Sequence, residues 1–158
     1  MIEFREIIKD DIPKLSKLYE SLLLYIKLET RDPYFEFNDL SQVSINDKLI
    51  KDIQDKTKKT FIAAENNNII GFIAGEITSC FLPNLKIDKV GYISAAYVTD
   101  EYRNKGIMKE LEKMMIYFFK ENHLEYMELN VISNNSTGIS CWKKLGYNTF
   151  REHMRKRI

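Results

Sequence analysis

The chain has 158 residues, of which 44% are hydrophobic and 30% charged; it can bury a core without disulfides or metal and has an ordinary soluble composition. Its formal net charge of +1 gives no general attraction for DNA, RNA or an acidic membrane. The two cysteines, Cys80 and Cys141, show no paired spacing, and together with two scattered histidines they make no metal-ligand set.

The first residues predict neither a secretory signal nor a membrane span. Residues 1–4 mix charged and apolar side chains, without a basic start followed by an apolar core. The apolar stretch 22–26 is far too short to cross a bilayer. We therefore expect a cytoplasmic protein with reduced thiols, and neither a membrane nor a nucleic acid as its partner.

The first third of the chain predicts one strand and two helices. Residues 3–8 resemble a strand, and apolar residues at helical spacing then predict an amphipathic helix over 11–28, with Asp10 as its N-cap. Residues 29–43 are expected to be irregular. A second helix follows, marked by apolar residues between 45 and 53.

The middle of the chain predicts a hairpin and a third long strand. Two strands, over 60–65 and 69–78, are separated by three asparagines, which tolerate the left-handed backbone of a tight turn. A loop over 79–87 leads to a strand that runs from about residue 90 to residue 99.

The last third of the chain alternates helices and strands. The clearest helical stripe covers 107–119, a strand follows over 126–132, and a short helix over 135–145 precedes a final strand or hairpin over 147–157. The order β α α β β β α β α β predicts a single α/β domain with a partly parallel sheet.

The most informative stretch joins the strand that ends at Thr99 to the helix after it. Between them lie Arg103, Asn104, Lys105 and Gly106. A helix start has unpaired N–H groups and a positive dipole end, and glycine lets the backbone approach a phosphate closely. The pattern indicates a pyrophosphate cradle, to which Arg103 and Lys105 add charge. The alternative is an ordinary strand-to-helix turn with solvated basic residues.

Two motifs resemble those of the GNAT superfamily of acyl-CoA-dependent N-acyltransferases. The family's R/Q-x-x-G-x-G/A loop is similar to residues 103–108, at Arg103 and Gly106. Its N-x-x-A motif, followed by an aromatic residue and K-x-G-F/Y, is similar to residues 135–147. The resemblance implies a GNAT-like α/β (α+β) fold: a mixed, partly parallel twisted sheet flanked by helices, with a V-shaped opening between two central strands.

The resemblance also implies acetyl-CoA as cosubstrate. Backbone amides of residues 103–108 would hold the pyrophosphate. Tyr97 and Val98 would pair through their backbone with the pantetheine arm, and the Val98 N–H would point at the thioester oxygen. Asn135 would bond the arm from the other side, although its position equally predicts a helix cap. The implied cofactor-binding residues are Tyr97, Val98, Arg103, Asn104, Lys105, Gly106, Ile107, Met108 and Asn135.

Two positions depart from the family pattern. Met108 replaces the second small residue of the loop and crowds the approach to it. Trp142 stands where the family often has a tyrosine that protonates the departing thiolate, and an indole N–H does not release its proton at ordinary pH. Tyr147, Cys141 or water are alternative acids, and release of the thiolate without any acid is a further alternative. A core anchor is the favoured interpretation of Trp142.

The implied reaction is direct attack of a primary amine on the thioester in a ternary complex. An amine with a pKa near 10.4 is deprotonated in only about one molecule in 2,500 at pH 7, so the enzyme must desolvate it or offer a base. Glu76 and Glu128, near the ends of their strands, are the candidate bases, with solvated acidic residues as the alternative. The Val98 N–H would meet the developing oxyanion.

The acceptor, a small-molecule or peptide amine, is not identified. Its pocket is expected in a segment where carboxylates and aromatic rings interleave, which suits a cationic amine; a solvated loop with rings tucked into the core is the alternative. These residues are Glu29, Asp32, Tyr34, Phe35, Glu36 and Phe37.

Two further functions stay open. Trp142 motivates a non-catalytic acyl-CoA-binding sensor of the same fold. The basic tail over 151–157 suits a nucleic-acid contact, although a solvated edge strand is the favoured interpretation. The acyl chain length and the oligomeric state, a homodimer included, are not determined by the sequence.

Overall fold

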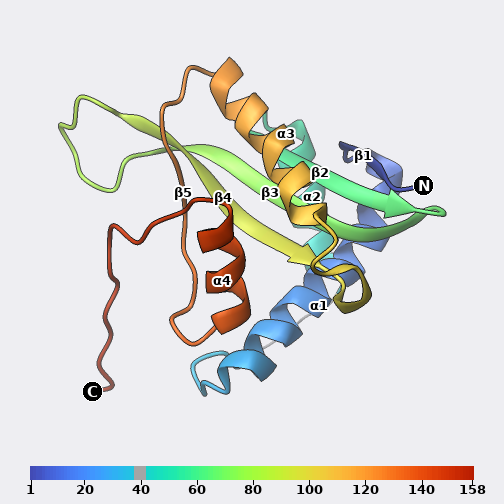
Figure 1. The fold of residues 1–158 in the computed structure, drawn as a ribbon, viewed down its shortest axis with the longest axis horizontal. Helices are drawn as coiled ribbons and strands as arrows, with labels where there is room; N and C mark the ends of the chain where they lie inside the picture. Colours follow the sequence, from blue (N-terminus) through green and yellow to red (C-terminus); the bar gives the residue numbers. More distant parts are fainter. Residues whose placement is uncertain (38–41) are drawn as a thin grey trace.

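The computed structural model describes residues 1–37 and 42–158. A twisted sheet lies at the centre, with α1 and α2 on one face and α3 and α4 on the other (Figure 1). Among the described residues, no helix is both long and apolar enough to cross a membrane.

The first part of the chain forms the elements that were expected, with different ends. A helix predicted over 11–28 extends to Thr30, so part of the stretch expected to be irregular is helical. Residues 31–37 are neither helix nor strand, and the rest of that stretch up to residue 41 lies outside the described residues. The elements are β1 (Glu3–Glu6), η1 (Lys9–Asp11), α1 (Ile12–Thr30), α2 (Gln42–Gln54), β2 (Lys58–Glu65) and β3 (Asn68–Ser79).

The second part departs from the prediction at its end. The strand expected over 126–132 is only three residues long, and the final strand expected over 147–157 is wrong, because residues 145–158 form neither helix nor strand. A strand over 147–157 would need a neighbouring strand for its hydrogen bonds, and the three-residue strand over 127–129 offers few backbone groups for that pairing. The elements are β4 (Lys89–Val98), η2 (Asp100–Tyr102), α3 (Ile107–Glu121), β5 (Met127–Leu129) and α4 (Ser136–Lys144).

The sheet is mixed, as predicted, and opens between its last two strands. Its order is β1-β2-β3-β4-β5, with antiparallel neighbours except for the parallel pair β4–β5. That pair ends at Ile93 and Leu129, while β4 continues to Val98. Ser94, the next residue of β4, is skipped in the register with β3 and forms a bulge. One edge of β4 is therefore left without a strand partner beyond the bulge.

Each face of the sheet carries its own hydrophobic core. Leu111 and Met115 of α3 are fully buried on one face, and Leu15 and Leu49 of α1 and α2 are buried on the other. Each such side chain contributes about 2 kcal/mol of transfer free energy. The helices are thereby fixed on the sheet, which sets the position of the loop that precedes α3.

Candidate functional site

The loop between β4 and α3 presents a cluster of unpaired amides. Asn104 and Gly106 adopt left-handed backbone conformations, with φ of 60° and 79°. Within the described residues, the amides of Asn104, Lys105 and Gly106 make no backbone hydrogen bond, and the first turn of α3 adds further free donors. A Cβ placed on Gly106 would meet nothing within 4 Å. The glycine thus serves the backbone conformation, and the amides face open space suited to an anion.

Arg103 does not extend its charge into that space. Its Nε donates to the Val98 carbonyl oxygen at 3.1 Å, and its guanidinium pairs with Asp100 at 2.8 Å. The guanidinium carbon also lies 4.7 Å from the ring centre of Tyr25 and 5.6 Å from that of Tyr97. The side chain therefore fixes the loop against the end of β4. The exposed Lys105 lies over the Tyr102 ring, at 4.9 Å.

The free edge of β4 directs alternate backbone groups into the opening. The Thr99 amide donates to the Ile70 carbonyl of β3 at 2.9 Å. Because antiparallel strands alternate, Val98 and Ala96 turn their N–H and C=O groups away from β3, toward the opening. By the same alternation Tyr97 turns its backbone toward β3, and its ring, not its amide, reaches the site. Ala96, which the motif did not single out, therefore presents its backbone groups to the opening as Val98 does.

Asn135 caps α4, as its position predicted. Its Oδ1 accepts the Gly138 N–H at 3.0 Å and the Tyr25 O–H at 3.3 Å. The neighbouring Asn134 donates its Nδ2 to the Thr30 carbonyl oxygen at 2.8 Å. The contacts of Asn135 with Tyr25 and of Asn134 with Thr30 join the start of α4 to α1. They lie on the far side of the opening from the loop over residues 103–106.

The two candidate bases lie in one cross-strand row. The register places Glu76 of β3 opposite Tyr92 of β4, and Tyr92 opposite Glu128 of β5. Met127 and Leu129 pack toward α3, so the carboxylate between them points to the other face, which carries α1. The row lies one residue before the point where β4 and β5 separate.

The two carboxylates of this row differ in their partners. Glu76 lies 3.7 Å from the Lys58 ammonium. No ion pair to Glu128 is present in the part of the chain that the structure describes. Between them, the Tyr92 hydroxyl accepts the Asn130 Nδ2 at 3.1 Å. Glu128 is therefore the carboxylate that is available to a new cation.

The remaining candidates are packed between α3 and α4. The Tyr147 hydroxyl is buried beside the Glu112 carboxyl and makes no hydrogen bond of good geometry within residues 1–37 and 42–158. Burial, and then the nearby Glu112 carboxyl, raise the pKa of Tyr147, and burial likewise raises the pKa of Cys141. Trp142 packs against the core and meets the Tyr147 ring edge to face, with centres 5.2 Å apart. This packing favours the core-anchor interpretation of Trp142.

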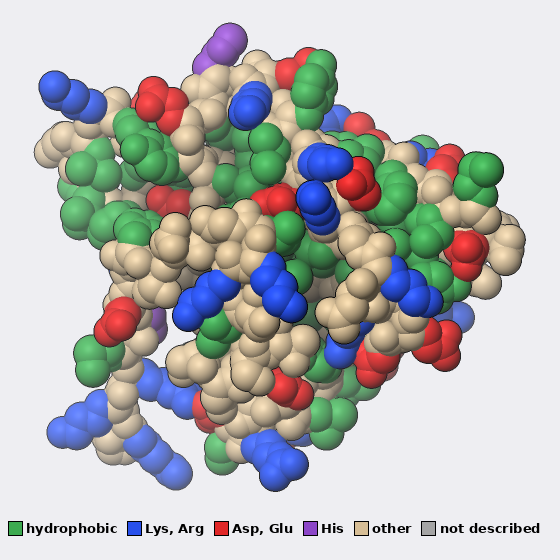
Figure 2. Space-filling model, in the orientation of Figure 1, with side chains coloured by type: hydrophobic (Ala, Val, Ile, Leu, Met, Phe, Trp, Pro, Cys, Tyr) green, Lys and Arg blue, Asp and Glu red, His purple; other side chains and the backbone are tan. Residues whose placement is uncertain are grey.

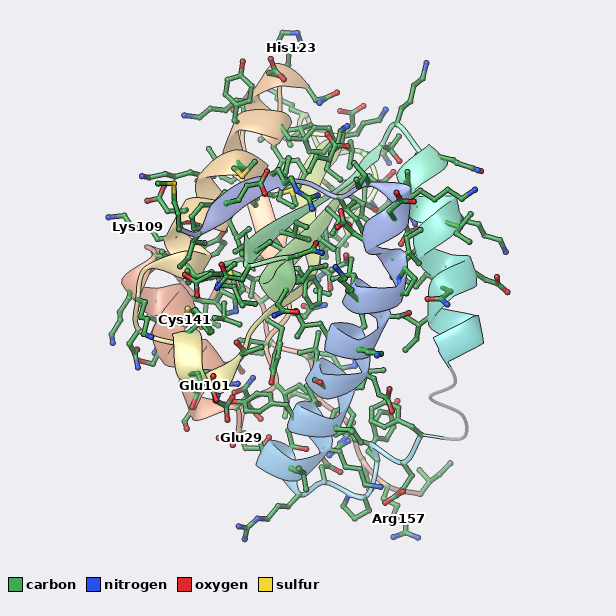
Figure 3. All side chains as sticks on the ribbon, turned by 90° about the vertical axis from the view of Figure 1, so that its right-hand side faces the viewer. Glu29, Glu101, Lys109, His123, Cys141 and Arg157 are labelled. Atoms are coloured by element: carbon green, nitrogen blue, oxygen red, sulfur yellow. The ribbon has the colours of Figure 1, made fainter. Side chains whose placement is uncertain are left out.

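The acidic residues expected at the acceptor pocket mostly have partners. Glu36 pairs with Lys27 at 2.8 Å. Asp32 pairs with Arg155, whose guanidinium lies over the Tyr34 ring. The Tyr34 amide, and then Arg155, lower the pKa of Asp32. Three expected residues remain. Glu29 is exposed and lies at the lower end of α1 in Figure 3. The Phe35 ring meets the Tyr34 ring edge to face, and Phe37 is half-exposed.

A shallow hollow of about 540 Å³ lies along the outer side of α4 rather than in the opening. Its rim carries two lysines, and basic side chains are visible over α4 in Figure 2. The lining residues are Ser133, Ser136, Ile139, Ser140, Lys143 and Lys144.

Comparison with protein families and sequences gives a consistent result. Residues 22–147 match the family model described as the acetyltransferase (GNAT) family. The uncharacterized N-acetyltransferase YobR of Bacillus subtilis is 31% identical over 67 residues, which are 42% of this chain and 27% of the relative. The SPbeta prophage-derived uncharacterized N-acetyltransferase YokL of the same organism is 35% identical over 95 residues, 59% of this chain and 50% of the relative. The match thus spans half or less of these curated relatives.

Solved structures share the fold at low identity. AAC(6')-Iy in complex with a bisubstrate analog, CoA-S-monomethyl-acetylneamine, has a TM-score of 0.81 at 14% identity, with 100% of this chain and 98% of that chain covered. A predicted acetyltransferase with acetyl-CoA from Clostridium acetobutylicum has a TM-score of 0.76 at 20% identity, with 99% and 96% covered. Glucosamine-6-phosphate N-acetyltransferase from Arabidopsis thaliana has a TM-score of 0.71 at 16% identity, with 99% and 98% covered.

Proposed function

Because this chain belongs to the acetyltransferase (GNAT) family, we propose that it transfers the acetyl group of acetyl-CoA to a primary amine, through one domain over residues 1–158. Two features that lie together carry the proposal. β4 leaves its parallel neighbour after Ile93, and the amides before α3 make no backbone hydrogen bond to any described residue. If the anionic group of a longer molecule bound at that helix head, the rest of the molecule could extend along the free edge of β4.

The cofactor-binding roles follow from these positions. The amides of residues 104–108 would bind the diphosphate, because they are free donors at a positive helix end. Ala96 and Val98 would pair with the pantetheine arm, and Asn135 would contact it from the other side. The hollow beside Lys143 and Lys144 suits the remaining phosphate by charge. When bound, acetyl-CoA supplies an activated thioester.

The protein's own groups would then handle charge and protons. Glu128 would take a proton from the acceptor ammonium, so that the nitrogen lone pair can form a bond to the carbonyl carbon. The Val98 N–H would donate to the oxygen as it gains negative charge. The carbon–sulfur bond would then break, and the attacking nitrogen would lose its second proton through water to the departing thiolate, which leaves a neutral amide and free thiol. The buried Tyr147 hydroxyl supports release without that side chain, and the Lys58 pair makes Glu76 the weaker base.

The acceptor would approach from the face that carries α1 and α2, because the Glu76–Tyr92–Glu128 row lies there. A small-molecule or peptide amine would meet carboxylate and aromatic groups on that face. The free thiols of Cys80 and Cys141 suit a reducing compartment, and we place the reaction in the cytoplasm.

The test is release of thiol when acetyl-CoA is mixed with polyamines, aminoglycosides, amino acids and lysine peptides, with calorimetric titration of CoA in parallel. Turnover with any amine supports the proposal. Binding of CoA without turnover would favour the sensor, which the packing of Trp142 at the family's tyrosine position motivates. In that case Trp142→Tyr should create turnover. Absence of binding by CoA and acetyl-CoA at millimolar concentration would overturn both functions.

A further inference from the structure

Tyr25 of α1 touches three separate segments at the site. Its ring lies under the Arg103 guanidinium, at 4.7 Å, and 6.1 Å from the centre of the Tyr97 ring. Its hydroxyl donates to Asn135 Oδ1 at 3.3 Å. The half-buried Tyr25 thus joins the end of β4, the loop before α3 and the N-cap residue of α4.

The contact between the Tyr25 ring and the Arg103 guanidinium supports the loop over residues 103–106. Arg103 is held by the Val98 carbonyl, Asp100 and two aromatic rings. Its backbone leads directly into the left-handed Asn104. Removing the Tyr25 ring takes away one wall of the Arg103 side chain, and with it a support for the loop conformation that leaves the amides free.

The second contact decides what Asn135 can do. An asparagine carbonyl accepts through two lone pairs, and its amide group donates two hydrogens. Both acceptor positions of Asn135 are used, by the Gly138 N–H and the Tyr25 O–H. Its Nδ2 has no hydrogen-bond partner among the described residues. A Cβ at Gly138 would come within 2.6 Å of that nitrogen, so the glycine leaves it uncovered. Asn135 is therefore set to donate only.

No ladder joins the two sides of the opening, because β4 and β5 stop pairing at Ile93 and Leu129. Two contacts to α1 bridge it, from Tyr25 to Asn135 and from Thr30 to Asn134. Given the proposed function, we propose that Tyr25 is a positioning residue. Through Arg103 it supports the diphosphate-binding loop, and through its hydroxyl it fixes Asn135 as a donor to a carbonyl oxygen of the pantetheine arm.

The two roles are separable with two probes. CoA carries both the diphosphate and the arm, whereas 3′-phospho-ADP carries the diphosphate without the arm. Tyr25→Phe keeps the ring and loses the hydroxyl, so it should weaken CoA binding about three- to tenfold and leave 3′-phospho-ADP binding unchanged. Tyr25→Leu loses the ring as well, and should weaken both probes. Tyr117→Phe, on the exposed side of α3, is the matched control and should change neither.

A second variant tests the donor role without touching Tyr25. Asn135→Asp keeps an acceptor for the Gly138 N–H and so keeps the cap, but it has no hydrogen to donate. It should weaken CoA about tenfold and 3′-phospho-ADP much less. Because both changes act on one bond, adding Tyr25→Phe to Asn135→Asp should cost nothing further.

Three results would overturn the inference while leaving the proposed function standing: unchanged CoA affinity in Tyr25→Phe, an equal loss for both probes, or additive losses in the double variant. With acetyl-CoA as substrate, Tyr25→Phe should raise KM and leave kcat nearly unchanged. Wild-type protein that bound neither probe would instead remove the proposed function, and this inference with it.

Discussion

The head of α3 and the contact between α3 and α4 treat their polar groups in opposite ways. At the head of α3, residues 104–106 are exposed, and their amides make no backbone hydrogen bond within the described chain. Between α3 and α4, Glu112 is 6% exposed and lies beside the buried Tyr147 hydroxyl, which makes no hydrogen bond of good geometry to a described residue. Gly106 and Tyr147 both belong to motifs of the same family, yet only the region around Gly106 leaves its polar groups open to a ligand. Exposure to solvent, rather than membership of a motif, therefore distinguishes the residues that can bind a ligand from those that pack in the core.

The largest effect is expected at the exposed region. Gly106→Asp places a carboxylate where a diphosphate would bind, and like charges in contact cost several kcal/mol, so CoA affinity should fall by more than about a hundredfold. Gly106→Ala imposes the same strained φ of 79° without the charge, and should lose far less affinity. Calorimetry measures both, and melting temperatures confirm folding. Equal losses in the two variants would show that strain, not charge, controls the site.

The next largest effect concerns the cross-strand row. Glu128→Gln removes a base without changing shape, and should lower kcat about a hundredfold near pH 7. Glu76→Gln is the matched control on the same row, where the carboxylate already pairs with Lys58, and it should have a much smaller effect. The measurement is the rate of thiol release at saturating acceptor. If Glu76→Gln caused the greater loss, the assignment of the base would be reversed.

Much of this arrangement could be predicted from the sequence, because it depends on local signals. The apolar stripe of α3 and the asparagine turn specify a helix and a hairpin within a few residues of where they lie. The loop before α3 was identified by Gly106, whose φ of 79° few other residues adopt. The N-cap at Asn135 follows from its place before a short helix.

What could not be predicted depends on packing. Tyr25 belongs to the apolar stripe of α1, and only the docking of that helix turns its ring toward Arg103. The shared row of Glu76 and Glu128 requires the register of three strands. The tail alternates like a strand, but the sheet offers it no ladder, and Arg155 pairs with Asp32 instead.

A pH series on Glu112 examines the buried region. Burial raises the pKa of the Glu112 carboxyl, so the folded state favours its protonated form. That contribution to stability is complete below the unfolded pKa of about 4.3 and is lost as pH rises through the folded pKa. Glu112→Gln stays neutral, so its free energy of unfolding should rise relative to that of wild type as pH rises through the folded pKa of Glu112.

The control for that series is Glu110→Gln, on the same helix, where the carboxylate is half-exposed and pairs with Lys113 at 2.8 Å. Its free energy of unfolding should follow that of wild type closely, because exposed ion pairs contribute little. Urea unfolding between pH 4 and pH 8 gives both values. A Glu112→Gln variant that lost stability steadily toward neutral pH would show that the carboxylate is needed in its charged form.

The smallest effect is expected at Tyr147, the position that the motif marks for chemistry and the structure buries. Tyr147→Phe removes a buried hydroxyl that lies beside the Glu112 carboxyl without a hydrogen bond of good geometry to any described residue, and it keeps the edge-to-face contact with Trp142. Because no hydrogen bond of good geometry is lost, the free energy of unfolding should change by less than about 1 kcal/mol, and the melting temperature should stay nearly the same. The kcat should change by less than about twofold, because the raised pKa and the burial keep this proton in the core. A hundredfold fall in kcat would instead mean that the core between α3 and α4 opens during the reaction and that Tyr147 protonates the leaving thiolate.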